Sequence, residues 1–177
     1  MQNIVLWICG LSGTGKTTLA NLAAERLRAR GENVVVLDGD RMRAVLGWEE
    51  RHLPDERRQL AQTYGRLCRE IASQGPIVIC ATISLFHKVH EWNRANLPGY
   101  VEIYLKVPVD TLRQRDPKGL YADSEHDLDN TVVGIGLNYE EPVSPDLVIA
   151  NHGDTSPDDA VGQILDHLET WTPEAET

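Results

Sequence analysis

Short apolar runs alternate along this chain with longer stretches whose apolar residues recur at helical spacing. Continuous apolar runs, typical of strands buried on both faces of a parallel sheet, occur at residues 4–9, 33–37, 77–81, 100–107 and 147–150. Helical periodicity occurs at residues 16–30, 54–74, 86–95, 109–115 and 157–171. Strands and helices in this alternation form βαβ units. We therefore expect an α/β fold in which helices cover both faces of a five-stranded parallel sheet.

One segment departs from this alternation. Residues 119–145 are polar, contain several glycines and prolines, and are long for a plain connection, which is typical of a lid or a binding loop. With the arginines before them, they define an expected lid and substrate loop at about residues 113–145. The lid belongs to a single expected domain at residues 1–171, and residues 172–177 are expected to form a flexible tail.

Composition excludes several classes of protein. With 41% hydrophobic residues among 177, the chain can bury a core, so overall disorder is excluded. Its apolar runs are far shorter than the roughly 20 residues that span a bilayer, and the N-terminus lacks the basic region of a signal peptide. The three cysteines, Cys9, Cys68 and Cys80, are widely spaced, which argues against a disulfide framework or a zinc site. We expect a cytoplasmic protein with no membrane partner.

The net charge of −10 disfavours binding to nucleic acids or anionic membranes. All 17 lysines and arginines precede residue 119, and the remainder of the chain carries only acidic charges. Two interpretations of this distribution stay open. The last third forms a solvated acidic surface, or the arginine-rich first part binds a small polyanion.

The clearest motif follows the first expected strand. Residues 10–17 read Gly-Leu-Ser-Gly-Thr-Gly-Lys-Thr and fit G-x-x-x-x-G-K-[ST], the phosphate-binding P-loop. In such a loop the backbone N–H groups converge on phosphate oxygens, the lysine neutralises the β- and γ-phosphates, and the last hydroxyl faces Mg²⁺. The sequence therefore predicts ATP and Mg²⁺ as cofactors. The expected ATP-binding residues of the loop are Gly10, Leu11, Ser12, Gly13, Thr14, Gly15, Lys16, Thr17 and Thr18.

A P-loop alone does not define an activity. The guanine-reading pattern [NT]-K-x-D occurs nowhere in the chain, which disfavours a regulatory GTPase. The small size and the arginine-rich, lid-like segment favour a small-molecule kinase. A non-catalytic P-loop protein that binds or senses nucleotides stays open as the alternative.

Two further segments supply groups that a kinase needs. Two carboxylates, Asp38 and Asp40, follow the second expected strand with Arg41 and Arg43, and a kinase uses one carboxylate on the acceptor hydroxyl and another at Mg²⁺. An alternative for this segment is a turn in which Asp38 caps a helix and Asp40 is solvated.

The second segment follows the fourth expected strand. Arg113, Arg115 and Lys118 lie there, at the position of the mobile lid of P-loop kinases, where their charges would stabilise phosphoryl transfer. The alternative for these bases is the exposed end of an amphipathic helix.

Together these segments resemble the adenylylsulfate kinase family. GLSGTGKTTLA is shared with many kinases, whereas LDGDRMR and RDPKGLY together are specific to that family, and the spacing of Gly134, Ile135, Tyr139, Glu140 and Pro142 extends the resemblance over most of the chain. The resemblance implies a P-loop nucleotide kinase fold, usually a homodimer. It also implies transfer of the ATP γ-phosphoryl group to the ribose 3′-hydroxyl of a nucleotide.

The resemblance also implies roles for particular residues. Asp38 would be the base at the 3′-hydroxyl, which leaves Asp40, with Thr17, as the expected metal ligands. Lys16, Asp38, Asp40 and Lys118 are then the expected catalytic residues. The expected substrate-binding residues are Asp38, Arg41, Arg43, Arg57, Ile83, Ser84, Lys118 and Leu120, the last two in the closing lid. Ser84 matches a family serine proposed as a phosphorylated intermediate, although direct in-line transfer needs no such step.

Departures from the family pattern fall on the acceptor side. Arg41 and Leu60 replace family asparagines, His87 replaces an arginine, and His52 and Val132 replace the two phenylalanines that would stack on adenine. These changes favour a related acceptor over an inactive enzyme. The segments ATISLF and WN resemble a branch associated with cytidine diphosphoramidate kinases, so adenylylsulfate and cytidine diphosphoramidate both stay open as substrates.

Two smaller groups of residues each allow two interpretations. Trp48, Trp92, Tyr121 and Tyr139 could replace the lost stacking faces or could be core and rim residues. His87, His90 and Glu91 share a face of one expected helix, and a solvated helix face is favoured there over a metal site.

Overall fold

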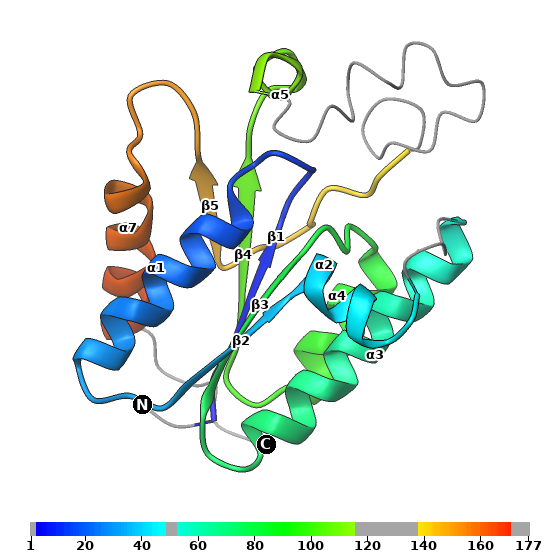
Figure 1. The fold of residues 1–177 in the computed structure, drawn as a ribbon, viewed down its shortest axis with the longest axis vertical. Coiled ribbons are helices and arrows are strands. Elements are labelled where there is room, and N and C mark those ends of the chain that lie inside the picture. The colour runs from blue at the N-terminus through cyan, green and yellow to red at the C-terminus, as the bar shows by residue number, and fades with distance from the viewer. Residues whose placement is uncertain (1–2, 49–52, 116–137, 171–177) are drawn as a thin grey trace.

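Strand β1 forms the centre of a five-stranded parallel sheet in the computed structural model, which describes residues 3–48, 53–115 and 138–170 (Figure 1). The strand order across the sheet is β2-β3-β1-β4-β5. The strands are β1 Val5–Cys9, β2 Val34–Asp38, β3 Ile77–Thr82, β4 Tyr100–Lys106 and β5 Leu147–Ala150. This confirms the expected α/β fold and the number of strands.

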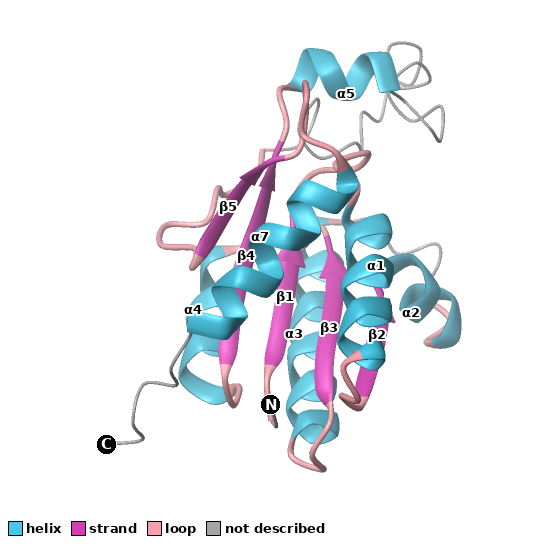
Figure 2. Ribbon diagram, turned by 90° about the vertical axis from the view of Figure 1, so that its left-hand side faces the viewer, coloured by secondary structure: helices cyan, strands magenta, loops and turns pink. Residues whose placement is uncertain are grey.

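Helices cover both faces of the sheet (Figure 2). Helices α1 and α7 pack on one face around a core that includes Leu6, Ile8 and Leu27, and α3 and α4 pack on the other around Trp7 and Tyr64. The helices are α1 Lys16–Ala29, α2 Gly39–Val45, α3 Pro54–Ala72, α4 His87–Asn96, α5 Val109–Arg115 and α7 Pro157–Thr170. None of the described helices combines the length and apolar character needed to cross a membrane.

The sequence left open whether a helix begins at Asp38. The segment after β2 was interpreted as a motif at the end of a strand, but residues 39–45 form the short helix α2. Asp38 is its N-cap and accepts hydrogen bonds from two backbone N–H groups of the first turn, which explains why a helix begins there. Strand β2 also ends one residue later than expected, at Asp38 itself.

The register of the strands brings three loops to the same edge of the sheet. Asp38 of β2 pairs with Ala81 of β3, and Cys9 of β1 pairs with Thr82. Three strands therefore end level with one another. Parallel α/β sheets place their ligand sites at the carboxyl ends of the strands, where neighbouring connections diverge to opposite faces.

Candidate active site

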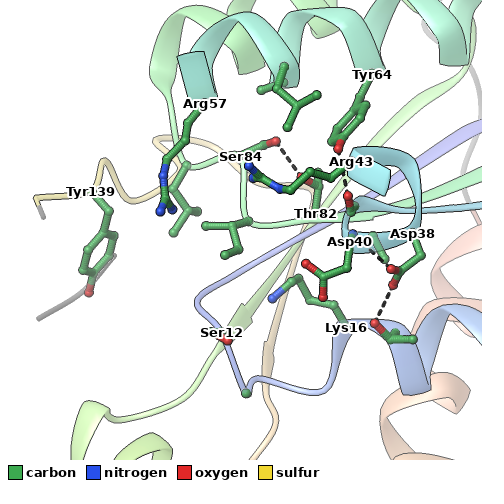
Figure 3. A pocket seen from close by; sticks show the side chains of 18 of the residues that line it. Ser12, Lys16, Asp38, Asp40, Arg43, Arg57, Tyr64, Thr82, Ser84 and Tyr139 are labelled. Carbon is green, nitrogen blue, oxygen red and sulfur yellow. Dashed lines mark hydrogen bonds between the residues drawn. The ribbon is translucent and has the colours of Figure 1, made fainter. Parts of the chain in front are cut away.

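A cavity of about 650 Å³ opens at this edge and joins the P-loop to the acceptor-side residues (Figure 3). The residues expected in the site that line it are Ser12, Gly13, Gly15, Lys16, Thr17, Thr18, Asp38, Asp40, Arg43, Arg57, Ile83, Ser84 and Arg115. They come from segments up to a hundred residues apart in the chain. The structure therefore brings together most of the predicted site residues that it describes.

Other predicted residues lie elsewhere. Arg41 is exposed on α2 and Arg113 is exposed beside Asp110, 3.5 Å away, and neither lines the cavity. Gly10, Leu11 and Thr14 are buried residues of the P-loop itself and do not line the cavity. The predictions for Lys118 and Leu120, and for His52, Tyr121 and Val132, fall outside the described residues.

The P-loop is stabilised from within. The Lys16 ammonium donates to the Leu11 carbonyl at 2.6 Å, and the Thr14 hydroxyl donates to the same oxygen at 2.9 Å. Gly15 has φ +91°, where a side chain is strained, and a Cβ atom there would lie 2.6 Å from Asn151 Nδ2. Glycine is therefore required at this position both by the backbone and by its neighbour.

Asn151 was not identified from the sequence. The Asn151 side-chain amide donates to the Thr14 carbonyl at 2.7 Å. The Arg115 guanidinium donates to the backbone carbonyl of Asn151 at 3.0 Å. The residue is buried, directly follows β5 and does not line the cavity. A polar residue directly after an expected strand was the one signal available for it.

Asp38 connects the P-loop to α2. Its Oδ1 accepts hydrogen bonds from the backbone N–H groups of Asp40 and Arg41, at 3.1 and 3.2 Å. Its Oδ2 accepts the hydroxyl hydrogen of Thr17 at 2.6 Å. The helix cap left open as an alternative therefore exists, and the same carboxylate also reaches the site. Asp40 is more exposed and lines the cavity from the first turn of α2 (Figure 3).

Tyr64 holds the start of α2 from the other side. Its hydroxyl donates to the Gly39 carbonyl at 2.8 Å. Burial raises the pKa of this hydroxyl, so it stays a neutral donor. The sequence marked Tyr64 only as a residue on the apolar face of a helix, because periodicity carries no information about a hydroxyl at its edge.

Two guanidinium groups line the cavity beyond the P-loop, on α2 and α3. They belong to Arg43 and Arg57. Burial, and secondly the like charge of Arg43, lower the pKa of Arg57. A bound anion would relieve both effects, and planar guanidinium groups suit sulfate and phosphate oxygens.

Aromatic side chains are distributed differently from the predictions. Tyr139 and Phe86 line the cavity. Phe86 is not among the stacking residues predicted from the sequence. Trp92 contacts the Arg69 guanidinium, 5.5 Å from its ring centre, and Trp48 packs against the core. The structure therefore supports Tyr139 as a stacking candidate and places the two tryptophans in packing roles.

His90 corrects the expectation of a solvated helix face. It is only 6% exposed and lies on the core side of α4. Its Nδ1 is 2.9 Å from Glu102 Oε1, and the Cys9 thiol lies within 4.8 Å of both groups. His87 does lie at the surface, beside Glu140.

Comparisons with known proteins agree with this geometry. The sequence model of the family described as adenylylsulphate kinase matches residues 2–150. Cytidine diphosphoramidate kinase of Campylobacter jejuni is 34% identical over 167 residues, which cover 93% of this chain and 95% of that protein. Adenylyl-sulfate kinase of Bacillus velezensis is 36% identical over 170 residues, which cover 95% of this chain and 86% of that protein.

A solved structure extends the agreement to three dimensions. The APS kinase CysC of Mycobacterium tuberculosis, in complex with AMPPNP and APS, superposes with a TM-score of 0.87 at 28% identity and covers 96% of this chain and 99% of its own. Sequence and fold thus match over nearly the whole length. The chain belongs to the adenylylsulphate kinase family.

Proposed function

We propose that this protein transfers the γ-phosphoryl group of ATP to the ribose 3′-hydroxyl of a nucleotide, either adenylyl sulfate or a related one such as cytidine diphosphoramidate. Its relatives are kinases named for these two substrates. The observation that carries the proposal is that one cavity is lined by the P-loop, by two carboxylates and by two half-buried arginines, Arg43 and Arg57. A nucleotide sensor would need only the first of these, so the non-catalytic alternative is not favoured.

Mg²⁺ fits the residues beside the P-loop. Thr17 and Asp38 offer a hydroxyl and a carboxylate in direct contact, and such hard oxygen donors suit this cation. When bound, Mg²⁺ neutralises charge on the β- and γ-phosphates. Lys16 lies in the same cavity and adds a second positive charge toward those phosphates.

The contact between Thr17 and Asp38 also bears on which carboxylate acts as base. Both oxygens of Asp38 already accept hydrogen bonds, and one of these donors is the threonine of the metal side. Asp40 also lines the cavity, and it takes part in this cap through its backbone N–H rather than through its carboxylate. We therefore exchange the roles implied by the family resemblance: Asp38 supports Mg²⁺, and Asp40 accepts the proton of the acceptor hydroxyl.

The remaining parts of the proposal concern the acceptor and the assembly. Arg43 and Arg57 would hold the charged group at the 5′ side of the nucleotide, and Tyr139 or Phe86 would contact its base. A homodimer, as the resemblance implies, and a cytoplasmic location, as the composition and the N-terminus indicate, are part of the same proposal. Light scattering on the purified chain tests the oligomeric state.

The deciding experiment measures ATP consumption with adenylyl sulfate and with cytidine diphosphoramidate at equal concentration, followed by identification of the phosphorylated product. We expect one of them to be turned over with the new phosphate on the 3′-oxygen. Binding of ATP without turnover of either nucleotide would contradict the proposal and favour a sensor. Omission of Mg²⁺, with excess chelator, is the control and should abolish turnover.

A further inference from the structure

The part of the cavity wall formed by residues 82–86 contains a strained backbone. Ser84 has φ +25°, and Asn3 is the only other non-glycine residue with positive φ in the described parts of the chain. Positive φ is unfavourable for a residue with a side chain and persists only where surrounding contacts impose it. Ser84 is 6% exposed and lines the cavity, so the contacts that hold it also shape the site.

A buried histidine supplies one such contact. His90 Nε2 lies 2.7 Å from the Ser84 carbonyl oxygen, in a buried hydrogen bond. A carbonyl can only accept, so Nε2 must carry the hydrogen. On its other side the ring meets a carboxylate, Glu102 Oε1, at 2.9 Å from Nδ1, an ion-pair contact whose angles differ from those of a linear hydrogen bond. The ring therefore lies between two acceptor groups, the Ser84 carbonyl and the Glu102 carboxylate.

Glu102 is itself held in place. Its backbone N–H donates to Asp146 at 2.7 Å, and its Oε2 lies 3.4 Å from both the Arg94 guanidinium and the Tyr100 hydroxyl. The Glu102 side chain is only 3% exposed. A continuous set of contacts therefore runs from β4 through His90 to the Ser84 carbonyl.

The P-loop is stabilised by a different residue. Asn151, at the end of β5, holds the Thr14 carbonyl. No described hydrogen bond of His90 or Glu102 reaches the P-loop. Disturbing His90 should therefore affect the wall at residues 82–86 more than the ATP side.

From these contacts we infer that the His90–Glu102 pair is a positioning device for the acceptor side of the cavity. His90 does not line the cavity and acts through Ser84, whose carbonyl it holds. The inference rests on the proposed function only for the identity of the acceptor. The placement of the wall by the buried pair is independent of which nucleotide is bound.

Two substitutions of His90 separate this role from general stability. The amide of His90→Gln reaches as far as Nε2 and can still donate to Ser84, whereas the amide of His90→Asn reaches only as far as Nδ1. We expect H90N to raise KM for the acceptor about tenfold, as expected when a buried carbonyl is left without its donor, while KM for ATP stays within about twofold. H90Q should restore the acceptor KM to within about threefold of the starting protein. The acceptor is whichever of adenylyl sulfate and cytidine diphosphoramidate is turned over.

Hydrogen exchange gives a second readout that needs no acceptor. Peptides covering residues 82–88 should exchange faster in H90N than in H90Q, and peptides covering residues 10–18 should exchange equally in both. Equal rises in both KM values, or faster exchange in both peptides, would overturn the inference in favour of a global structural role. Unchanged exchange at residues 82–88 in H90N would overturn it as well. If the unsubstituted protein phosphorylates neither nucleotide, the proposed function fails, but the exchange comparison still tests the buried pair.

Discussion

The hydroxyl of Thr17 donates a hydrogen bond of 2.6 Å to Asp38, and this contact joins the P-loop to the turn that begins α2. Twenty-one residues separate the two in the chain. In a P-loop the hydroxyl at the position of Thr17 faces Mg²⁺, and on this contact the proposed function assigns Asp38 to the metal side. Asp40 lines the same cavity from the first turn of α2 and is the more exposed of the two carboxylates.

The first prediction compares the two carboxylates. Asp40→Asn should lower kcat by at least about 100-fold, as expected for loss of a general base, with little change in the Mg²⁺ concentration that gives half-maximal rate. Asp38→Asn keeps a good helix cap but weakens the metal side, so it should raise that Mg²⁺ concentration. Steady-state kinetics over a Mg²⁺ series, with calorimetric ATP binding as the folding control, measures both. A D40N enzyme with unchanged kcat would return the role of base to Asp38.

The second prediction concerns the anion site. Arg57→Ala should raise the acceptor KM by about 10- to 100-fold, because a charge-assisted hydrogen bond contributes about 1.5–3 kcal/mol. Arg58→Ala is the matched control, since Arg58 lies one residue later on α3, is exposed, and pairs with Asp55 at 2.9 Å. It should change KM less than about twofold. Similar effects of the two substitutions would show that general charge, and not the cavity, explains the result.

The third prediction tests support of the P-loop by Asn151. Asn151→Ala removes the hydrogen bond to the Thr14 carbonyl and should weaken ATP binding about fivefold, since a buried hydrogen bond contributes about 1 kcal/mol. The acceptor KM should change little. Asn96→Ala serves as the control because Asn96 is exposed and its amide bonds only to the preceding turn of its own helix. Calorimetry with ATP distinguishes the two, and equal affinities in them would exclude the proposed support.

The fourth prediction concerns stability at high pH. Burial, and secondly the nearby Glu102 carboxylate, raise the pKa of the Cys9 thiol, and burial likewise raises the pKa of Tyr100. The unfolded chain then loses protons at lower pH than the folded one, beginning near the ordinary cysteine pKa of about 8.5. Stability should therefore be fully present below that pH and fall as pH rises above it.

Cys9→Ala isolates one part of this effect. Urea unfolding at pH 8, 9 and 10 should show a shallower decline in the variant than in the unsubstituted protein, because one of the groups that must stay neutral is gone. The comparison uses the slope with pH, so any loss of packing at residue 9 cancels. Parallel slopes would mean that Cys9 does not ionise on unfolding in this range.

Much of the fold was accessible from local patterns. The apolar runs of β1 and β3 are fully buried, as expected for strands covered on both faces, and their bounds match the predictions to within one residue. The P-loop was recognised because its chemistry requires particular residues at fixed spacing. The residues that make up such a pattern lie within about a dozen positions of one another. The pattern can therefore be recognised without knowledge of the tertiary structure.

The missed features share a different origin. Helix α2 depends on a cap by Asp38, whose side chain could equally have remained in a turn. Tyr64 and His90 were assigned from helical periodicity, which says which face a residue occupies but not which polar atom lies opposite. Their partners, Gly39 and Ser84, come from other elements of the fold.

By itself, the sequence determined the order of strands and helices, the phosphate-binding loop and the set of acidic and basic groups available for phosphoryl transfer. Only the tertiary structure decided which of those groups meet, because the level ends of β1, β2 and β3 bring Thr17 into contact with Asp38 and bring Asp40 to the same cavity. Hydrogen bonds depend on tenths of an ångström between residues distant in the chain. Hydrophobic patterning tolerates larger displacements, and it therefore predicts the layers of the fold better than the roles of individual side chains.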